Sequence, residues 1–174
     1  MSLPRAALLT LALTLELLAP PAPASAAFSV ATQSSPSFGL TLDGTDQTGV
    51  STLVVRVTQT DAGANGKTGW NLTIDSTPLQ SAGGAQLAPD ATSLVSGGYT
   101  CAVGPCTNPT NTVPPPVPIP AGSPPPPAVK VFNAAKNTGV GVFDVTGNLQ
   151  TSVRAHADAG TYTSTMTVAL VRGL

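Results

Sequence analysis

Apolar residues recur at every second position along most of this chain, and they do not recur at the 3.6-residue spacing of an amphipathic helix. The alternation is clearest at six positions, which are Leu53, Val55, Val57, Trp70, Leu72 and Ile74. An alternation of this kind is typical of a strand that buries one face. Residues 61–66 carry a turn signal between the two segments, which predicts that they pair as a hairpin.

Further strands are predicted on both sides of this pair. The terminal segment, residues 162–170, is the longest alternating run, with Tyr162, Ser164, Met166, Val168 and Leu170 on one face. Weaker candidates are residues 27–31, 38–42, 129–133, 141–145 and 149–153. About eight short strands separated by turns predict an all-β fold, a single antiparallel β-sandwich of the immunoglobulin-like kind.

The charged residues support this fold class and exclude several functions. Only 9% of the 174 residues are charged, with 7 Lys and Arg against 8 Asp and Glu, for a net charge of -1. Long surface helices usually need many charged residues, and this chain has a single Glu, Glu16. A balance this even also excludes a basic nucleic-acid binder or an acidic tail protein, so no nucleic acid is expected among the partners.

The first 26 residues have the layout of a secretory signal peptide. Arg5 provides a positive start, residues 6–18 form a mostly apolar run, and Ala24 and Ala26 provide the small side chains of an A-x-A cleavage site. The run is shorter than the roughly 20 residues that span a bilayer. We therefore expect cleavage after Ala26 rather than an uncleaved anchor, which leaves no membrane span in a secreted or extracellular mature chain.

The mature chain, residues 27–174, has a length that suits one domain. Cys101 and Cys106 flank a Gly-Pro turn, and export favours their oxidation to a disulfide over a metal site, which would need more ligands. Residues 107–128 are proline-rich and predict an extended segment that stays out of the sheets. We interpret it as a long surface insertion rather than a linker, because the part that follows is too short to form a second domain.

Catalytic chemistry finds little support in the sequence. His156 is the only histidine, and it is expected to be a solvated loop residue rather than a general base. The acidic residues of the mature chain are all Asp, which we expect to cap turns rather than to form a carboxylate pair or a calcium site. No enzyme activity, cofactor or metal is therefore predicted, and a small secreted hydrolase with an unrecognised site is the alternative.

Two segments resemble the WxL-domain proteins of Gram-positive cell surfaces. Trp70-Asn71-Leu72 matches their first Trp-x-Leu motif, and residues 159–162, Ala-Gly-Thr-Tyr, match the lead into the second, where Val168 stands in the Trp position before Leu170. The resemblance implies a secreted, β-rich, non-catalytic module that attaches non-covalently to cell-wall peptidoglycan or to another surface protein. It also implies a binding role for Trp70, Leu72, Val168 and Leu170, whereas the residues alone favour a buried Trp70.

Overall fold

A computed structural model describes residues 27–61 and 67–173 of the chain. The signal peptide with Ala24 and Ala26 and the turn signal at 62–66 lie outside the described residues. The described chain consists of strands joined by turns and loops, and it contains no helix long and apolar enough to cross a membrane. The strands are β1 (Phe28–Ser34), β2 (Gln47–Gln59), β3 (Trp70–Ser76), β4 (Gln80–Ser81), β5 (Thr92–Thr107), β6 (Val117–Ile119), β7 (Val129–Ala134), β8 (Val140–Val153), β9 (Tyr162–Thr163) and β10 (Met166–Arg172).

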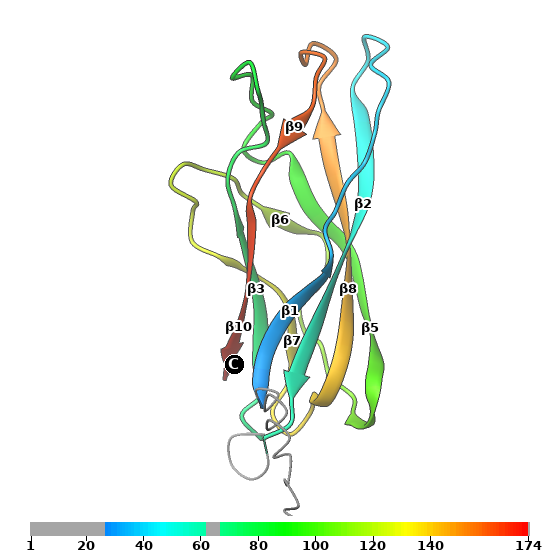
Figure 1. Ribbon diagram of the computed structural model, residues 1–174, viewed down its shortest axis with the longest axis vertical. Coiled ribbons are helices and arrows are strands. Elements are labelled where there is room, and N and C mark those ends of the chain that lie inside the picture. Colours follow the sequence, from blue (N-terminus) through cyan, green and yellow to red (C-terminus); the bar gives the residue numbers. More distant parts are fainter. Residues whose placement is uncertain (1–26, 62–66, 174) are drawn as a thin grey trace, which may run out of the picture.

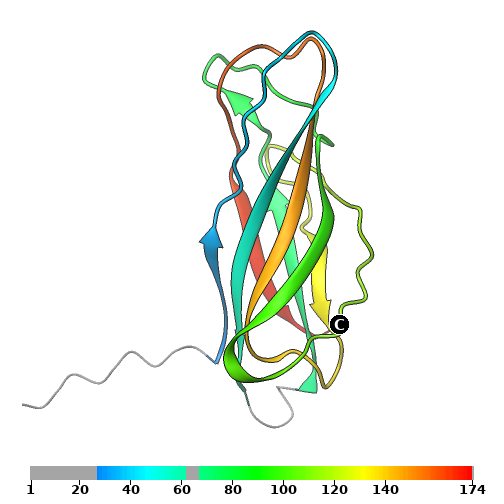
Figure 2. The same cartoon turned by 90° about the vertical axis from the view of Figure 1, so that its right-hand side faces the viewer.

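Two antiparallel sheets pack face to face, so the all-β prediction is confirmed (Figure 1). The larger sheet has the order β1-β2-β8-β5-β6, and the smaller one has the order β10-β3-β7. A third pair, β4-β9, lies at one end of the molecule, and both ends of the described chain lie at the other end (Figures 1 and 2).

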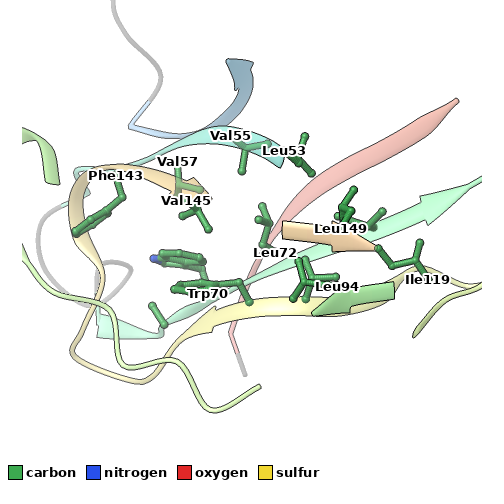
Figure 3. Close-up of a cluster of buried hydrophobic side chains, with 14 residues drawn as sticks. Leu53, Val55, Val57, Trp70, Leu72, Leu94, Ile119, Phe143, Val145 and Leu149 are labelled. Atoms are coloured by element: carbon green, nitrogen blue, oxygen red, sulfur yellow. The ribbon is translucent and has the colours of Figure 1, made fainter. Parts of the chain in front are cut away.

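The core fills the space between the two sheets. Val55, Val57 and Phe143 point inward from the larger sheet toward Trp70 and Leu72 of the smaller one (Figure 3). Each of these five side chains is almost fully buried. The alternation in the sequence therefore marks the inner faces of β2 and β3 correctly.

The predicted hairpin is wrong, because its two segments belong to different sheets. β2 pairs with β1 and β8, whereas β3 pairs with β10 and β7. Both segments have one apolar face, and facing each other across the core buries both faces. If the two segments had paired side by side in one sheet, a second layer of structure would have been needed to bury their apolar faces.

Four other predictions need correction at the level of single elements. Residues 141–145 and 149–153 form one continuous strand, β8, and the predicted strand at 162–170 is interrupted between β9 and β10. Residues 38–42 form no strand. Within the proline-rich segment, β6 does pair with β5, with Ile119 fully buried, so the expectation that this segment stays out of the sheets is wrong there.

Candidate functional site

A polar recess lies at the end of the sandwich that is distant from both ends of the described chain. Its walls are the loop between β4 and β5 and the loop between β8 and β9 (Figure 1). The short pair β4-β9 holds the two loops next to each other, with Gln80 opposite Thr163 and Ser81 opposite Tyr162. The loop ends of a β-sandwich are a common place for binding residues, because the sheets hold the loops rigidly.

The recess has a volume of about 140 Å³ and combines apolar and hydrogen-bonding groups. Its polar lining comes from Gln86, Ser152, Arg154, His156, Asp158 and Tyr162, and its apolar lining comes from Ala85, Leu87, Ala88 and Ala157. Such a mixture suits a small polar ligand group with an apolar side.

Backbone hydrogen bonds fix the loop that carries the charged groups. The Ala157 amide donates to the Arg154 carbonyl at 2.9 Å, and the Ala155 amide donates to Oδ1 of Asp46 at 2.8 Å. The Tyr162 hydroxyl donates to the Asp158 carbonyl at 2.8 Å. The loop is thus held by its main chain, which leaves its charged side chains exposed and free to meet a ligand.

The Arg154 guanidinium and the His156 imidazole provide nitrogen donors at this recess, alongside the Gln86 amide and the Ser152 and Tyr162 hydroxyls. Arg154 forms no ion pair within the described residues, where the two ion pairs are Arg56 with Asp144 and Arg172 with Asp61. His156 is exposed, as its assignment to a solvated loop predicted. The single carboxylate in the lining is that of Asp158. Hydrolysis by paired carboxylates would require a second one, which no residue of this lining provides.

The four residues of the Trp-x-Leu stretches lie on two neighbouring strands rather than at the recess. Leu72 of β3 is directly opposite Leu170 of β10, and Val168 is opposite Ile74. Trp70 and Leu72 are buried at 1% and 2% exposure, while Val168 and Leu170 are half-buried and pack against the core. The structure therefore brings the two stretches together with their side chains directed into the sandwich.

Trp70 is a core residue with a buried polar contact. Its ring stacks on Phe132, with 5.8 Å between the ring centroids. Its Nε1 donates to the Gly139 carbonyl at 2.8 Å. The sequence-based preference for a buried Trp70 is confirmed, and its indole does not form an exposed platform for a ligand.

The predicted disulfide is confirmed, and its position separates it from the recess. Cys101 and Cys106 are bonded within the irregular second half of β5, where the register with β8 shifts. This part of β5 lies at the opposite end of the sandwich from the β4-β9 pair (Figure 1). The disulfide therefore closes a local loop and does not shape the recess.

The turn interpretation of the Asp residues is confirmed for Asp43. Both the hydroxyl and the amide of Thr45 donate to its Oδ1, at 2.7 Å and 3.0 Å. Hydrogen bonds from the Thr45 and Gln47 side chains lower the pKa of Asp43 to about 2. The described residues contain no group of three or more His, Cys, Asp or Glu side chains that could hold a metal ion.

The sequence predicts no recess, although a solvated loop is expected at His156. Residues 85–88 gave no sign that they would lie opposite this loop. They carry no charge and no regular alternation, and their position depends on the pairing of β4 with β9, strands of two residues each. A strand of that length is too short to be recognised by period.

Comparison of the chain with protein-family models, with curated proteins and with solved structures finds no match. The fold and the geometry of the recess are therefore the basis for any functional conclusion.

Proposed function

We propose that this protein is a secreted, non-catalytic binding or structural module of a bacterial cell surface. It attaches non-covalently to cell-wall peptidoglycan or to a neighbouring surface protein, as the resemblance to WxL-domain proteins implies. The domain is an immunoglobulin-like sandwich whose proline-rich segment forms surface loops before and after the short strand β6. The disulfide between Cys101 and Cys106 supports an oxidising compartment outside the cytoplasm.

The observation that carries this proposal is the position and chemistry of the recess. It is formed by loops at the end of the sandwich opposite the ends of the described chain, and its exposed side chains include the donors Arg154 and His156 and the acceptor Asp158. Peptidoglycan offers hydroxyl, amide and carboxylate groups that Arg154, His156 and the Tyr162 hydroxyl can bind. Each such hydrogen bond contributes only about 0.5 to 1.5 kcal/mol net, so binding is micromolar or weaker.

The four motif residues contribute to binding indirectly, by stabilising the fold. Trp70 and Leu72 are buried, and Val168 and Leu170 pack on the core. We assign them the task of joining β3 to β10 instead of direct ligand contact. Their substitution would then reduce binding only by reducing the fraction of folded protein.

The test is co-sedimentation of the mature chain with purified cell walls. Arg154→Ala and His156→Ala, separately and together, remove the guanidinium and the imidazole from the recess and should weaken binding several-fold. Lys136→Ala is the matched control, because it removes one exposed positive charge from a loop at the other end of the sandwich. Because few ion pairs can form, binding should change little between low and high salt.

Two results would count against the proposal. Binding that is nanomolar and collapses as salt rises would mean that charge dominates the interaction. Release of soluble wall fragments during the incubation would support the hydrolase alternative instead.

A further inference from the structure

The two edges of the smaller sheet differ in whether anything covers them. At the β7 edge, the Asn133 amide donates to Oδ1 of Asn111 at 3.1 Å, and the Ala135 amide donates to the Thr110 carbonyl at 3.0 Å. Oδ1 of Asn133 in turn accepts from the Thr112 amide at 2.7 Å. The start of the proline-rich segment thus occupies this edge.

The β10 edge has no such cover among the described residues. β10 pairs with β3 on one side, and no strand of the described chain pairs with it on the other. β1 comes close to it near Arg172, whose guanidinium lies 3.9 Å from the centroid of the Phe28 ring. Within the described residues β1 pairs with β2 in the larger sheet and not with β10.

The register identifies which backbone groups of β10 face outward. Gly173 donates to Gly69, and Thr77 donates to Thr165, at the two ends of the β3-β10 pair. Hydrogen-bonded and non-hydrogen-bonded pairs alternate in an antiparallel ladder. Four residues of β10 therefore direct their amide and carbonyl groups away from β3, namely Met166, Val168, Leu170 and Arg172.

β10 also lacks the features with which natural edge strands avoid association. It has no proline and no bulge, and its one charge, Arg172, is engaged by Asp61, Gln59 and Phe28. On its outer face Val171 is 49% exposed. A regular, apolar and nearly uncharged edge favours the addition of another strand.

We propose that β10 pairs with β10 of a second copy of this chain, in antiparallel orientation about a two-fold axis at Ala169. Two of the four outward-facing residues lie on each side of this axis, at equal distances from it. Each of them is therefore opposite an outward-facing residue of the second copy. Met166 pairs with Arg172 of the copy and Val168 with Leu170, in about eight main-chain hydrogen bonds. The two three-stranded sheets become one sheet of six.

The outer face of β10 fits the same arrangement. Ala169 meets Ala169 of the copy in a non-hydrogen-bonded pair, with about 4.5 Å between the Cα atoms, where a small side chain permits close approach. Exposed Val171 lies opposite Thr167. A second copy of the chain fits this edge because the outward-facing residues of β10 are placed symmetrically about Ala169. The pairing brings no unpaired like charges together. The interface is small, so the dimer is weak.

Sedimentation equilibrium of the mature chain from about 10 µM to about 1 mM tests the proposal. The dimer fraction should rise across this range. Ala169→Lys places two ammonium groups at the axis and should weaken association at least about tenfold, while its exposed side chain leaves the monomer folded by circular dichroism. Val50→Lys, on the exposed outer face of β2, adds the same charge elsewhere and should not change association.

Disulfide cross-linking tests the register independently of affinity. Under mild oxidation Ala169→Cys should form a covalent dimer with itself. Thr167→Cys alone should not, but it should cross-link when mixed with Val171→Cys. A chain that stays monomeric up to about 1 mM would overturn the proposal. So would equal association of wild type and Ala169→Lys, or cross-linking of Thr167→Cys with itself.

Discussion

Replacement of Trp70 is the most direct test of how the core is held together. Trp70→Ala removes the whole indole from between the two sheets, and truncation of a buried aromatic residue to Ala costs about 3–5 kcal/mol. Trp70→Phe keeps much of the stacking on Phe132 but removes the donor to the Gly139 carbonyl. A buried acceptor that loses its donor costs about 1–3 kcal/mol, so this variant should lie between Trp70→Ala and wild type.

The structure makes the Gly139 contact specific. Gly139 has a φ of 69°, and an added Cβ would lie 2.6 Å from Nε1 of Trp70. The main chain therefore presents its carbonyl to the indole from a position that only glycine can occupy. Gly139→Ala should destabilise the fold, because the added Cβ would lie 2.4 Å from Cβ of Ala134 as well as against the indole. Its effect should be only partly additive with that of Trp70→Phe, since both variants disturb the contact between Trp70 and Gly139.

The measurement is urea unfolding of the mature chain, followed by far-ultraviolet circular dichroism because Trp70 is the only Trp of the chain. Val50→Ala, at a position that is 63% exposed, serves as the control and should change the unfolding free energy by less than about 0.5 kcal/mol. A Trp70→Ala variant within about 1 kcal/mol of wild type would refute the assignment of Trp70 to the core.

Three further predictions concern processing, the disulfide and acid. Mass spectrometry of the secreted protein should give an N-terminus at Ala27, and a start upstream of Ala22 would contradict the cleavage prediction. Replacing both Cys101 and Cys106 by Ser should lower the unfolding free energy by about 2 kcal/mol, because the disulfide closes a small loop; unchanged urea midpoints would contradict this. Hydrogen bonds from Arg56 lower the pKa of Asp144, so the stabilisation by this pair is present above the ordinary Asp pKa and is lost as the pH falls through the lowered one. Asp144→Asn should therefore make stability depend less on pH in the acid range, and the change should be small because Arg56 is partly exposed.

The sequence was sufficient for the inner faces of the strands but not for their partners. The alternate spacing of Leu53, Val55 and Val57 predicts that one face of their strand is buried, whichever strand pairs with it. Which strand that is depends on contacts far along the chain, and the alternation of β2 and β3 suits pairing across the core as well as pairing in one sheet. The hairpin error has this origin.

Glycine caused a second kind of error. The two strands predicted at 141–145 and 149–153 leave out Gly147, but this residue lies in the middle of β8, where an added Cβ would lie 2.7 Å from Cδ1 of Leu94. The Leu94 side chain occupies the space beside Gly147, and the chain does not turn there. β5 was missed for a related reason, since its Gly, Ser and Thr residues and shifted register leave no clear alternation.

The proline-rich segment shows where residue propensity fails as a guide. Pro118 lies in β6, opposite Ser93 of β5. β6 is at the edge of the larger sheet, where a residue without an amide hydrogen is tolerated. Val117 and Ile119 on either side then direct their side chains toward the core. The recess was even less accessible to sequence reasoning, because it depends on two loops brought together by the shortest strand pair of the fold.

The pairing of β3 with β10 has a consequence for how the chain reaches its folded state. Asn71 donates to the Gly173 carbonyl across 102 positions of sequence, and β2 pairs with β8 over a similar span. Contacts between residues so far apart require large loops to close before they contribute stability, so a chain of this topology folds slowly. The smaller sheet is complete only when its last strand, β10, has joined β3. A chain that carries an export signal, as residues 1–26 predict, gains time in this way to cross a membrane before its sheets close.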